Sequence, residues 1–218
     1  MRTALRMGAA FMWVGAMTTL VGCGYEVGSG KYAENLRETP EFKAITISEG
    51  LEAEVVVGGA KEVLVTGDDN LLSKVRTEVR NDILFIDIDE TSWSVSGSLV
   101  VKITVPELES VDASGGVRME VVGIASESFA CTASGGSDIT LSGQTTQLTL
   151  DTSGGSQVRA PDLAASKADV TLSGAGTARV RVADELGLTL SGASTLTVIG
   201  QPTTVRMDVS GASQLLYE

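Results

Sequence analysis

Apolar and polar residues alternate in short runs along most of the chain, and in residues 111–217 a recurring turn interrupts the alternation. In this turn Ser is followed by Gly and then by Gly or Ala. The six copies are Ser114-Gly115, Ser134-Gly135, Ser153-Gly154, Ser173-Gly174, Ser191-Gly192 and Ser210-Gly211, at intervals of 20, 19, 20, 18 and 19 residues. A turn at nearly constant spacing indicates a repeat architecture.

The positions around each turn are apolar with a period of two. Counted from the Ser, they are −3, −1, +5 and +7, as in Val111, Ala113, Met119 and Val121 of the first copy. This period predicts two strands per repeat, each with one buried face. A second set of turn residues follows half a repeat later, as Gly123, Ser142-Gly143, Pro161-Asp162, Ala183-Asp184 and Gly200-Gln201-Pro202.

A single repeat of this kind cannot bury its own apolar face, but stacked repeats can. We therefore predict an all-β fold: a parallel β-helix in the form of a two-sided β-solenoid, with coils about 4.8 Å apart. The outward position −2 reads Asp112, Thr132, Asp151, Thr171, Thr189, Asp208, so that no two Asp follow one another in the predicted stack. Cys131 falls at an inward position and is interpreted as a buried small hydrophobic residue.

Residues 39–110 lack the Ser-Gly turn but keep short alternating runs. We expect irregular early coils here that also cap the N-terminal end of the stack, since exposed strand edges invite aggregation. A helical turn is predicted near residues 68–75, with Asp68 or Asp69 as its N-cap. The domain predicted for 39–218 thus divides into irregular coils over 39–110 and regular repeats over 111–218.

The N-terminus has the pattern of a secretory signal. Two Arg precede an uncharged apolar run, and Leu20-Val21-Gly22-Cys23 is similar to the lipobox of bacterial lipoproteins. We expect a signal peptide over 1–22, lipidation of Cys23 and a tether over 23–38. Gly rather than Asp follows Cys23, which favours the outer membrane in the Gram-negative sorting pattern.

Several stretches together resemble one bacterial family. They are Phe42-Lys43-Ala44-Ile45, Gly67-Asp68-Asp69-Asn70-Leu71-Leu72, Leu84-Phe85-Ile86 and Val105-Pro106-Glu107-Leu108, followed by the Ser-Gly turns. The chain is similar here to the auto-transporter adhesin, head GIN domain family. The resemblance implies a pectin-lyase-like β-helix and a role in cell adhesion, and it offers no catalytic residues. Because the repeats run to Glu218, we expect the lipid on Cys23 to take the place of an auto-transporter's own membrane anchor.

Composition narrows the choice of function. The chain has no His, which excludes Ser-His-Asp and Cys-His catalysis and His-ligated metals. Its formal charge is −12, and −14 once Arg2 and Arg6 are removed with the signal, which argues against a nucleic-acid partner. The two Cys cannot build a disulfide scaffold or a four-thiolate metal site.

Few residues remain as candidates for chemistry. Six aligned Ser indicate a structural turn, not a nucleophile. Asp87 and Asp89 share one face of a strand and could hold a cation, although a solvated strand face explains them better. Trp93 in a polar loop could stack on a sugar or could equally cover the edge of the core. We expect no catalytic residue, no bound metal and no cofactor.

These patterns predict a non-enzymatic lipoprotein that presents a rigid β-solenoid for adhesion or envelope interactions. Its partners would be the membrane, through the lipid, and a glycan or protein at the cell surface. The sequence leaves open whether the chain forms an oligomer. The alternatives are a carbohydrate-binding module and a polysaccharide-acting enzyme. A groove lined by several acids with Arg or Lys would favour the enzyme.

Overall fold

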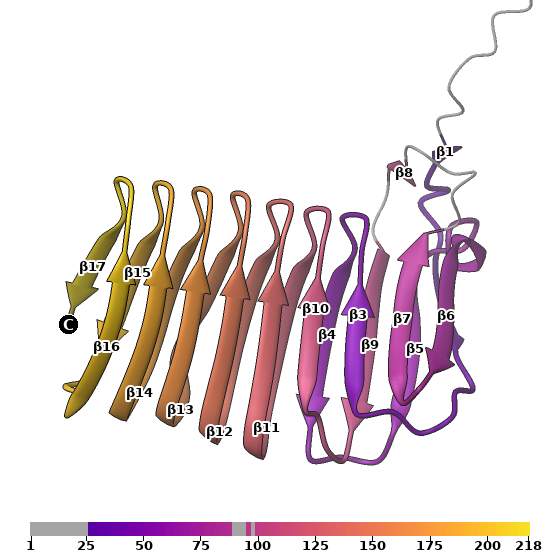
Figure 1. The fold of residues 1–218 in the computed structure, drawn as a ribbon. Helices are drawn as coiled ribbons and strands as arrows, with labels where there is room; N and C mark the ends of the chain where they lie inside the picture. Colours follow the sequence, from indigo (N-terminus) through magenta and orange to yellow (C-terminus); the bar gives the residue numbers. More distant parts are fainter. Residues whose placement is uncertain (1–25, 89–94, 97–98) are drawn as a thin grey trace, which may run out of the picture.

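The computed structural model describes residues 26–88, 95–96 and 99–218, and it is a β-solenoid with two sheets facing each other (Figure 1). Cys23, Asp89 and Trp93 lie outside the described residues. The predicted all-β, two-sided solenoid is therefore confirmed. A single short 3₁₀-helix is the only helical element among the described residues.

The repeating half supplies a regular stack of parallel strands. Four long strands each run along one sheet, bend, and continue along the other. The strands of this half are β10 (Ser110–Ala113), β11 (Arg118–Ala133), β12 (Asp138–Thr152), β13 (Gln157–Leu172), β14 (Thr177–Leu190), β15 (Thr195–Ile199), β16 (Thr204–Val209) and β17 (Gln214–Tyr217). Neighbouring coils pair in parallel with equivalent residues in register, as in Val111 with Cys131 and Cys131 with Leu150.

The core lies between the two sheets and is built from the predicted inward positions. At −3, −1, +5 and +7 every residue of the first five copies is buried, and Cys131 fills one such position. Thr152 is the one polar residue among them. The sixth copy is different, because three of its four inward side chains are exposed.

The Ser-Gly turns form one edge of the stack, at the top of Figure 1. The first Gly of each turn has a positive φ between 69° and 79°, a left-handed conformation that suits Gly. Each turn lies directly on the turn before it: the amide of Ala193 donates to the carbonyl of Gly174 at 2.7 Å, and the amide of Ala212 to that of Gly192 at 2.7 Å.

The second set of turn residues does not break β11 to β14, although Gly200-Gln201-Pro202 does separate β15 from β16. At Val121–Ile124, Thr140–Ser142 and Ala160–Ala164 the chain bends from one sheet to the other within a strand, and the ladder shifts register there. The predicted second turn is thus mostly a bulge-like bend, because a bulge bends a strand while pairing continues on both sides.

The N-terminal half is irregular, as predicted. It contains β3 (Ala44–Ile47), β4 (Glu52–Val57), β5 (Glu62–Asp68), the 3₁₀-helix η1 (Leu72–Lys74), β6 (Val75–Arg80), β7 (Ile83–Ile88), β8 (Val95–Ser96) and β9 (Leu99–Val105). The coil formed by β3 and β4 lies between β7 and β9 on one side and β10 and β11 on the other. The coil formed by β7 and β9 therefore comes later in the sequence than the coil of β3 and β4 that it covers.

Antiparallel strands close the N-terminal end. β6 pairs with β7, and β5 pairs with both β9 and β2 (Tyr32–Leu36). The short β1 (Glu26–Val27) pairs with β8. The expectation of a tether over 23–38 does not fit this part of the structure, since residues 32–36 form a strand of the cap.

Side chains of the Asp68–Asn70 loop hold the segment before β2. The Asp68 carboxylate accepts from the Gly30 amide at 2.8 Å, and the Asp69 carboxylate accepts from the Ser29 hydroxyl at 2.5 Å. Asp68 and Asp69 were predicted to cap a helical turn. This is wrong, because the residue at the N-cap of η1 is Leu71, without a side-chain cap.

Candidate functional site

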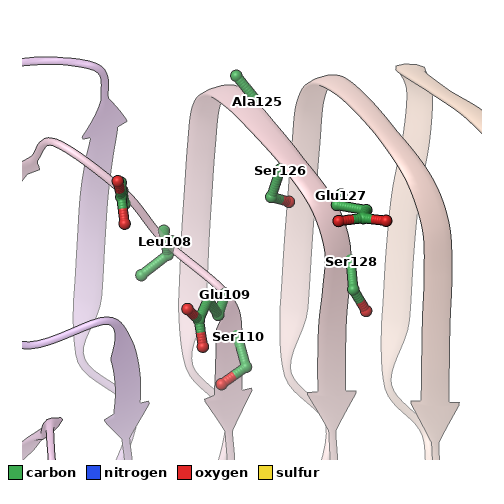
Figure 2. A pocket seen from close by; sticks show the side chains of 8 residues that line it. Leu108, Glu109, Ser110, Ala125, Ser126, Glu127 and Ser128 are labelled. Carbon is green, nitrogen blue, oxygen red and sulfur yellow. The ribbon is translucent and has the colours of Figure 1, made fainter.

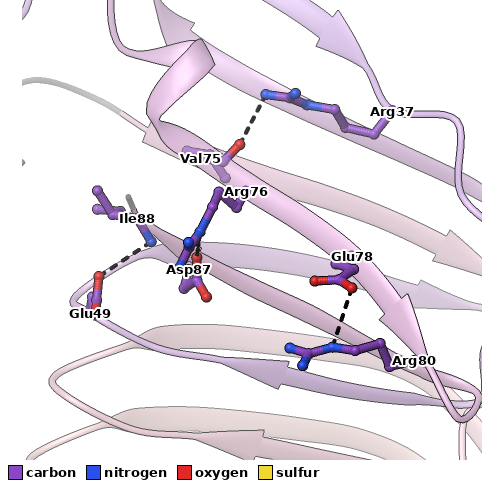
Figure 3. A network of polar contacts seen from close by, with 8 residues as sticks. All are labelled: Arg37, Glu49, Val75, Arg76, Glu78, Arg80, Asp87 and Ile88. Atoms are coloured by element: carbon purple, nitrogen blue, oxygen red, sulfur yellow. Dashed lines mark hydrogen bonds and ion pairs between the residues drawn. The ribbon is translucent and has the colours of Figure 1, made fainter. Parts of the chain in front are cut away.

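Asp87 is part of an ion pair, not of an open cation site. It lies on β7 directly opposite Arg76 of β6, whose Nε is 2.7 Å from the Asp87 Oδ1 (Figure 3). Its predicted companions, Asp89 and Trp93, lie outside the described residues, so their grouping with Asp87 stays a prediction. In the part of the chain that the structure describes, no three His, Cys, Asp or Glu side chains form a group that could hold a metal ion.

The rest of the network in Figure 3 joins parts of the N-terminal cap. The guanidinium of Arg37 donates to the carbonyls of Leu72 at 2.6 Å and Val75 at 3.2 Å, which links the end of β2 to η1 and β6. Burial lowers the pKa of Arg37 from its ordinary value. Arg80 Nε lies 3.5 Å from Glu78 Oε1, and the guanidinium also lies over the ring of Phe85. These contacts stabilise the cap.

The predicted turn residues all lie on the Ser-Gly edge, and their side chains do not form a catalytic group. The Ser173 and Ser210 hydroxyls donate weakly to the carbonyls of Thr152 and Leu190, at 3.4 and 3.3 Å. Sequence reasoning missed a second serine, three residues after the first. Ser137, Ser156 and Ser194 are buried there, and the hydroxyls of Ser137 and Ser194 donate to the turn carbonyls of Ser134 and Ser191. The signal was present, since four of six copies read Ser-Gly-x-Ser.

The outward −2 positions form the predicted ladder of Asp and Thr. The register places Asp112 beside Thr132, Thr132 beside Asp151, and Thr189 beside Asp208. Partial burial raises the pKa of Asp112. Inside the same sheet, burial and the charges of Asp112 and Asp151 raise the pKa of the Cys131 thiol, so it stays protonated and unreactive.

A shallow groove follows the bend on the opposite edge from the Ser-Gly turns. One part of it, of about 630 Å³, is lined by residues 107–110 and 125–128 (Figure 2). It continues past residues 125–127 over the next coils, as a hollow of about 470 Å³ lined also by residues 144–146, 164–166 and Ala183. We call this continuous surface the bend groove.

The bend groove presents small hydroxyl side chains and carboxylates. Ser110, Ser126 and Ser128 lie along it, and Glu127 lies beside Ser126 (Figure 2). The Ser126 hydroxyl is buried and has no hydrogen-bond partner among the residues that the structure describes.

One cation lies beside the groove. Lys43 Nζ is 3.1 Å from Glu107 Oε2 and 3.3 Å from Glu109 Oε1, and hydrogen bonds to these carboxylates raise the pKa of Lys43. The ammonium therefore stays charged, and it cannot act as the neutral base that a Ser nucleophile would need. The groove thus combines several carboxylates with one Lys, which is the pattern expected for the polysaccharide-acting alternative, but Lys43 is held between Glu107 and Glu109 as a charged group. The groove can offer hydrogen bonds and charge to an extended polar ligand.

Comparison with known proteins supports the fold. An adhesin-like structure from Bacteroides fragilis, described as a "putative adhesin", is 17% identical, covers 88% of this chain and 100% of its own, and has a TM-score of 0.73. A "putative lipid binding protein" from Parabacteroides distasonis (15% identity, 89% and 100% coverage, TM-score 0.53) and a "putative adhesin" from Parabacteroides merdae (17%, 89% and 99%, 0.52) share it as well. No curated protein matches the sequence significantly.

The family comparison covers both the irregular coils and most of the regular repeats. The matching model is described as "Putative auto-transporter adhesin, head GIN domain", and it spans residues 41–202. This range includes the Asp68–Asn70 loop, the bend groove and five of the six Ser-Gly turns. The resemblance inferred from those stretches is therefore confirmed, and the chain belongs to the auto-transporter adhesin, head GIN domain family.

Proposed function

We propose that this protein is an exported, lipid-anchored and non-enzymatic module, which presents its solenoid at the outer membrane for adhesion. The observation that carries the proposal is the continuous surface of the bend groove, along which Ser, Thr, Gln and Glu side chains lie. It crosses several coils, it is shallow, and its carboxylates and hydroxyls are suited to binding rather than to chemistry. No helix among the described residues is long and apolar enough to cross a membrane.

The arrangement of the ends is compatible with anchoring at Cys23. The first described residues, Glu26 and Val27, form β1 beside the N-terminal cap, far along the stack from β17 (Figure 1). An anchor attached before β1 would hold the stack by its capped end. The coils of the bend groove and the C-terminal end would then remain accessible to partners.

The anchor is tested by changing each cysteine in turn. In cells that express the full chain, Cys23→Ala should abolish lipid attachment, measured by mass spectrometry, and should release the protein from detergent-extractable membranes. Cys131→Ala is the matched control, since the buried thiol should affect neither. If the Cys23→Ala protein still carries lipid or still partitions into membranes, the anchor assignment is wrong.

Adhesion is tested at the bend groove. Ala125 is exposed on the groove, so Ala125→Trp should obstruct it without disturbing the core. Cells that display this variant should adhere less to mucin-coated surfaces than cells that display the parent chain at the same surface level. Ala193→Trp, on the Ser-Gly edge, should adhere normally. Equal adherence of all three would contradict a role for the groove.

A carbohydrate ligand is the second candidate, favoured by the row of Ser hydroxyls in the groove. A glycan array probed with the purified chain separates it from protein-directed adhesion, because binding to no glycan would exclude it. The Parabacteroides distasonis relative is described as a lipid-binding protein. The bend groove favours a polar ligand instead, since Leu108 is buried and the other side chains that line this part are those of Ser, Glu and one Ala.

A further inference from the structure

The C-terminal end of the stack is an open sheet edge. β16 pairs only with β14 and β17 only with β15, so the outer edge of both strands is unpaired within the described part of the chain. The inward side chains Met207, Val209 and Tyr217 are 60%, 43% and 52% exposed. Their ladder neighbours Leu188, Leu190 and Val198 are all buried. This end of the core is therefore uncovered, in contrast to the N-terminal cap.

We propose that the open edge binds a second copy of this chain through the same edge, in a two-fold symmetric pair. A two-fold axis perpendicular to the two sheets places β16 antiparallel to β16 of the other copy, and β17 antiparallel to its own counterpart. Both sheets then continue across the interface, and the exposed apolar positions of one copy face those of the other. The unpaired amides and carbonyls gain partners in the same step.

The sequence of β16 is complementary to itself in one register. Directly opposite residues of an antiparallel pair point to the same face of the sheet. With Met207 opposite Met207 of the other copy, Val205 faces Val209 on the inward side. On the outward side Arg206 faces Asp208, twice by symmetry. In this register each charged side chain of β16 therefore opposes one of opposite charge, and each inward apolar side chain opposes another apolar side chain.

The neighbouring registers are unfavourable. To keep the inward faces together, β16 can only shift by whole pairs of residues. One such shift centres the pair on Arg206 and opposes two arginines, and the other centres it on Asp208 and opposes two carboxylates. Like charges directly opposite one another destabilise a sheet. The charge pattern therefore selects the Met207-centred register.

The size of the interface sets the expected affinity. Six residues at about 3.3 Å each give an end face roughly 20 Å long, across two sheets about 10 Å apart. Such a face buries on the order of 1,000 Å² in total, near the lower limit for specific interfaces. The pair should form reversibly, at micromolar concentrations.

The first test uses two charge reversals. In sedimentation velocity over a concentration series, the purified full-length chain in detergent should dimerise at micromolar concentration, and Arg206→Asp and Asp208→Arg should each weaken dimerisation at least tenfold. Mixing the two variants should restore a heterodimer, because each then offers the charge that the other lacks. Asp151→Arg, in the same outward column but inside the stack, should dimerise like the parent.

The second test traps the register. Met207→Cys should form a disulfide-linked dimer under mild oxidation, since directly opposed residues lie at a distance that a disulfide can span. Val205→Cys should not, because its two copies are offset along the strands. The parent chain under the same oxidant gives the background from its own cysteines. A monomer at 100 micromolar, dimerisation unchanged by both reversals, or equal cross-linking of the two cysteine variants would overturn the proposal.

Discussion

At the scale of single residues, two small residues of each repeat, a Gly and a Ser, maintain the Ser-Gly edge. The first Gly of each turn adopts a left-handed conformation while it lies directly on the backbone of the turn before it. The Ser three residues later pairs its hydroxyl with a turn carbonyl in the copies that begin at Ser134, Ser191 and Ser210, and it is buried in the first two of these. Because a buried carbonyl or hydroxyl without a partner costs about 1–3 kcal/mol, these serines are structural residues.

Gly192→Ala should destabilise the stack. Gly192 has a φ of +79°, and an added Cβ would lie 2.4 Å from the carbonyl oxygen of Gly174. We expect a loss of at least about 2 kcal/mol in the free energy of unfolding, measured by chemical denaturation. Gly155→Ala is the control: an added Cβ there meets nothing within 4 Å. If both variants unfold at the same denaturant concentration, the explanation by close turn stacking fails.

Asp112→Asn should slightly stabilise the protein at neutral pH. Because partial burial raises the pKa of Asp112 in the folded state, folding favours its protonated form, and the carboxyl lowers stability as the pH rises through its titration range. The variant should have a Tm up to about 2 °C higher at pH 7. The difference should disappear below about pH 4, where the unfolded carboxyl is protonated too. A difference that persists at pH 3 would assign the effect to packing instead.

At the scale of elements, the regular coils could be predicted and the cap could not. Each coil repeats the same inward positions, so Val111, Cys131 and Leu150 alone indicate a parallel ladder with its register. By contrast, β2 pairs with β5 about 30 residues away, and nothing in its sequence repeats. The side chains that hold the segment before β2 come from Asp68, Asp69 and Asn70, whose local pattern is equally that of a helix N-terminus.

Asn70→Ala should loosen the segment before β2. Asn70 Oδ1 accepts from the Ser29 amide at 2.9 Å, and its Nδ2 donates to the Val27 carbonyl at 3.0 Å. Hydrogen exchange should become faster in residues 27–31, while Tm changes by no more than about 2 °C because the ladder between β2 and β5 remains. Gln144→Ala, exposed on the bend, should leave exchange in this segment unchanged. Unchanged exchange in Asn70→Ala would show that backbone pairing alone orders it.

At the scale of the whole molecule, the candidate surfaces depend on coils being stacked. The bend groove combines residues from consecutive coils, so no single segment contains it. The predicted ligand site, by contrast, was drawn from one short segment that contains Asp87, Asp89 and Trp93. Of these three residues only Asp87 lies among the described residues, and it forms an ion pair with Arg76. The coil order of β3, β7 and β10 could not be predicted either, since alternation reports which face is buried and not which strand comes next.

Removal of one whole coil should be tolerated. Deleting residues 153–172 joins Thr152 to Ser173 and lets β14 stack on β12, with Thr189 beside Asp151 and no like charges opposed. The shortened chain should fold with a lower Tm, as expected for a stack of nearest-neighbour units. Deleting only residues 153–162 should abolish folding, measured by circular dichroism, because the following strands would face the wrong sheet. If both shortened chains unfolded cooperatively at the same temperature, the whole coil would not be the unit of folding.

The hydrogen bonds between coils run along the axis of the stack, and this has a consequence under mechanical load. If the chain is held near β1 and pulled from β17, the force opens those bonds one rung at a time rather than shearing many at once. Each coil of 18–20 residues that peels away would release about 60 Å of chain. A cell held by such a module would therefore meet a yielding connection, which dissipates a pull in steps before the attachment at either end has to fail.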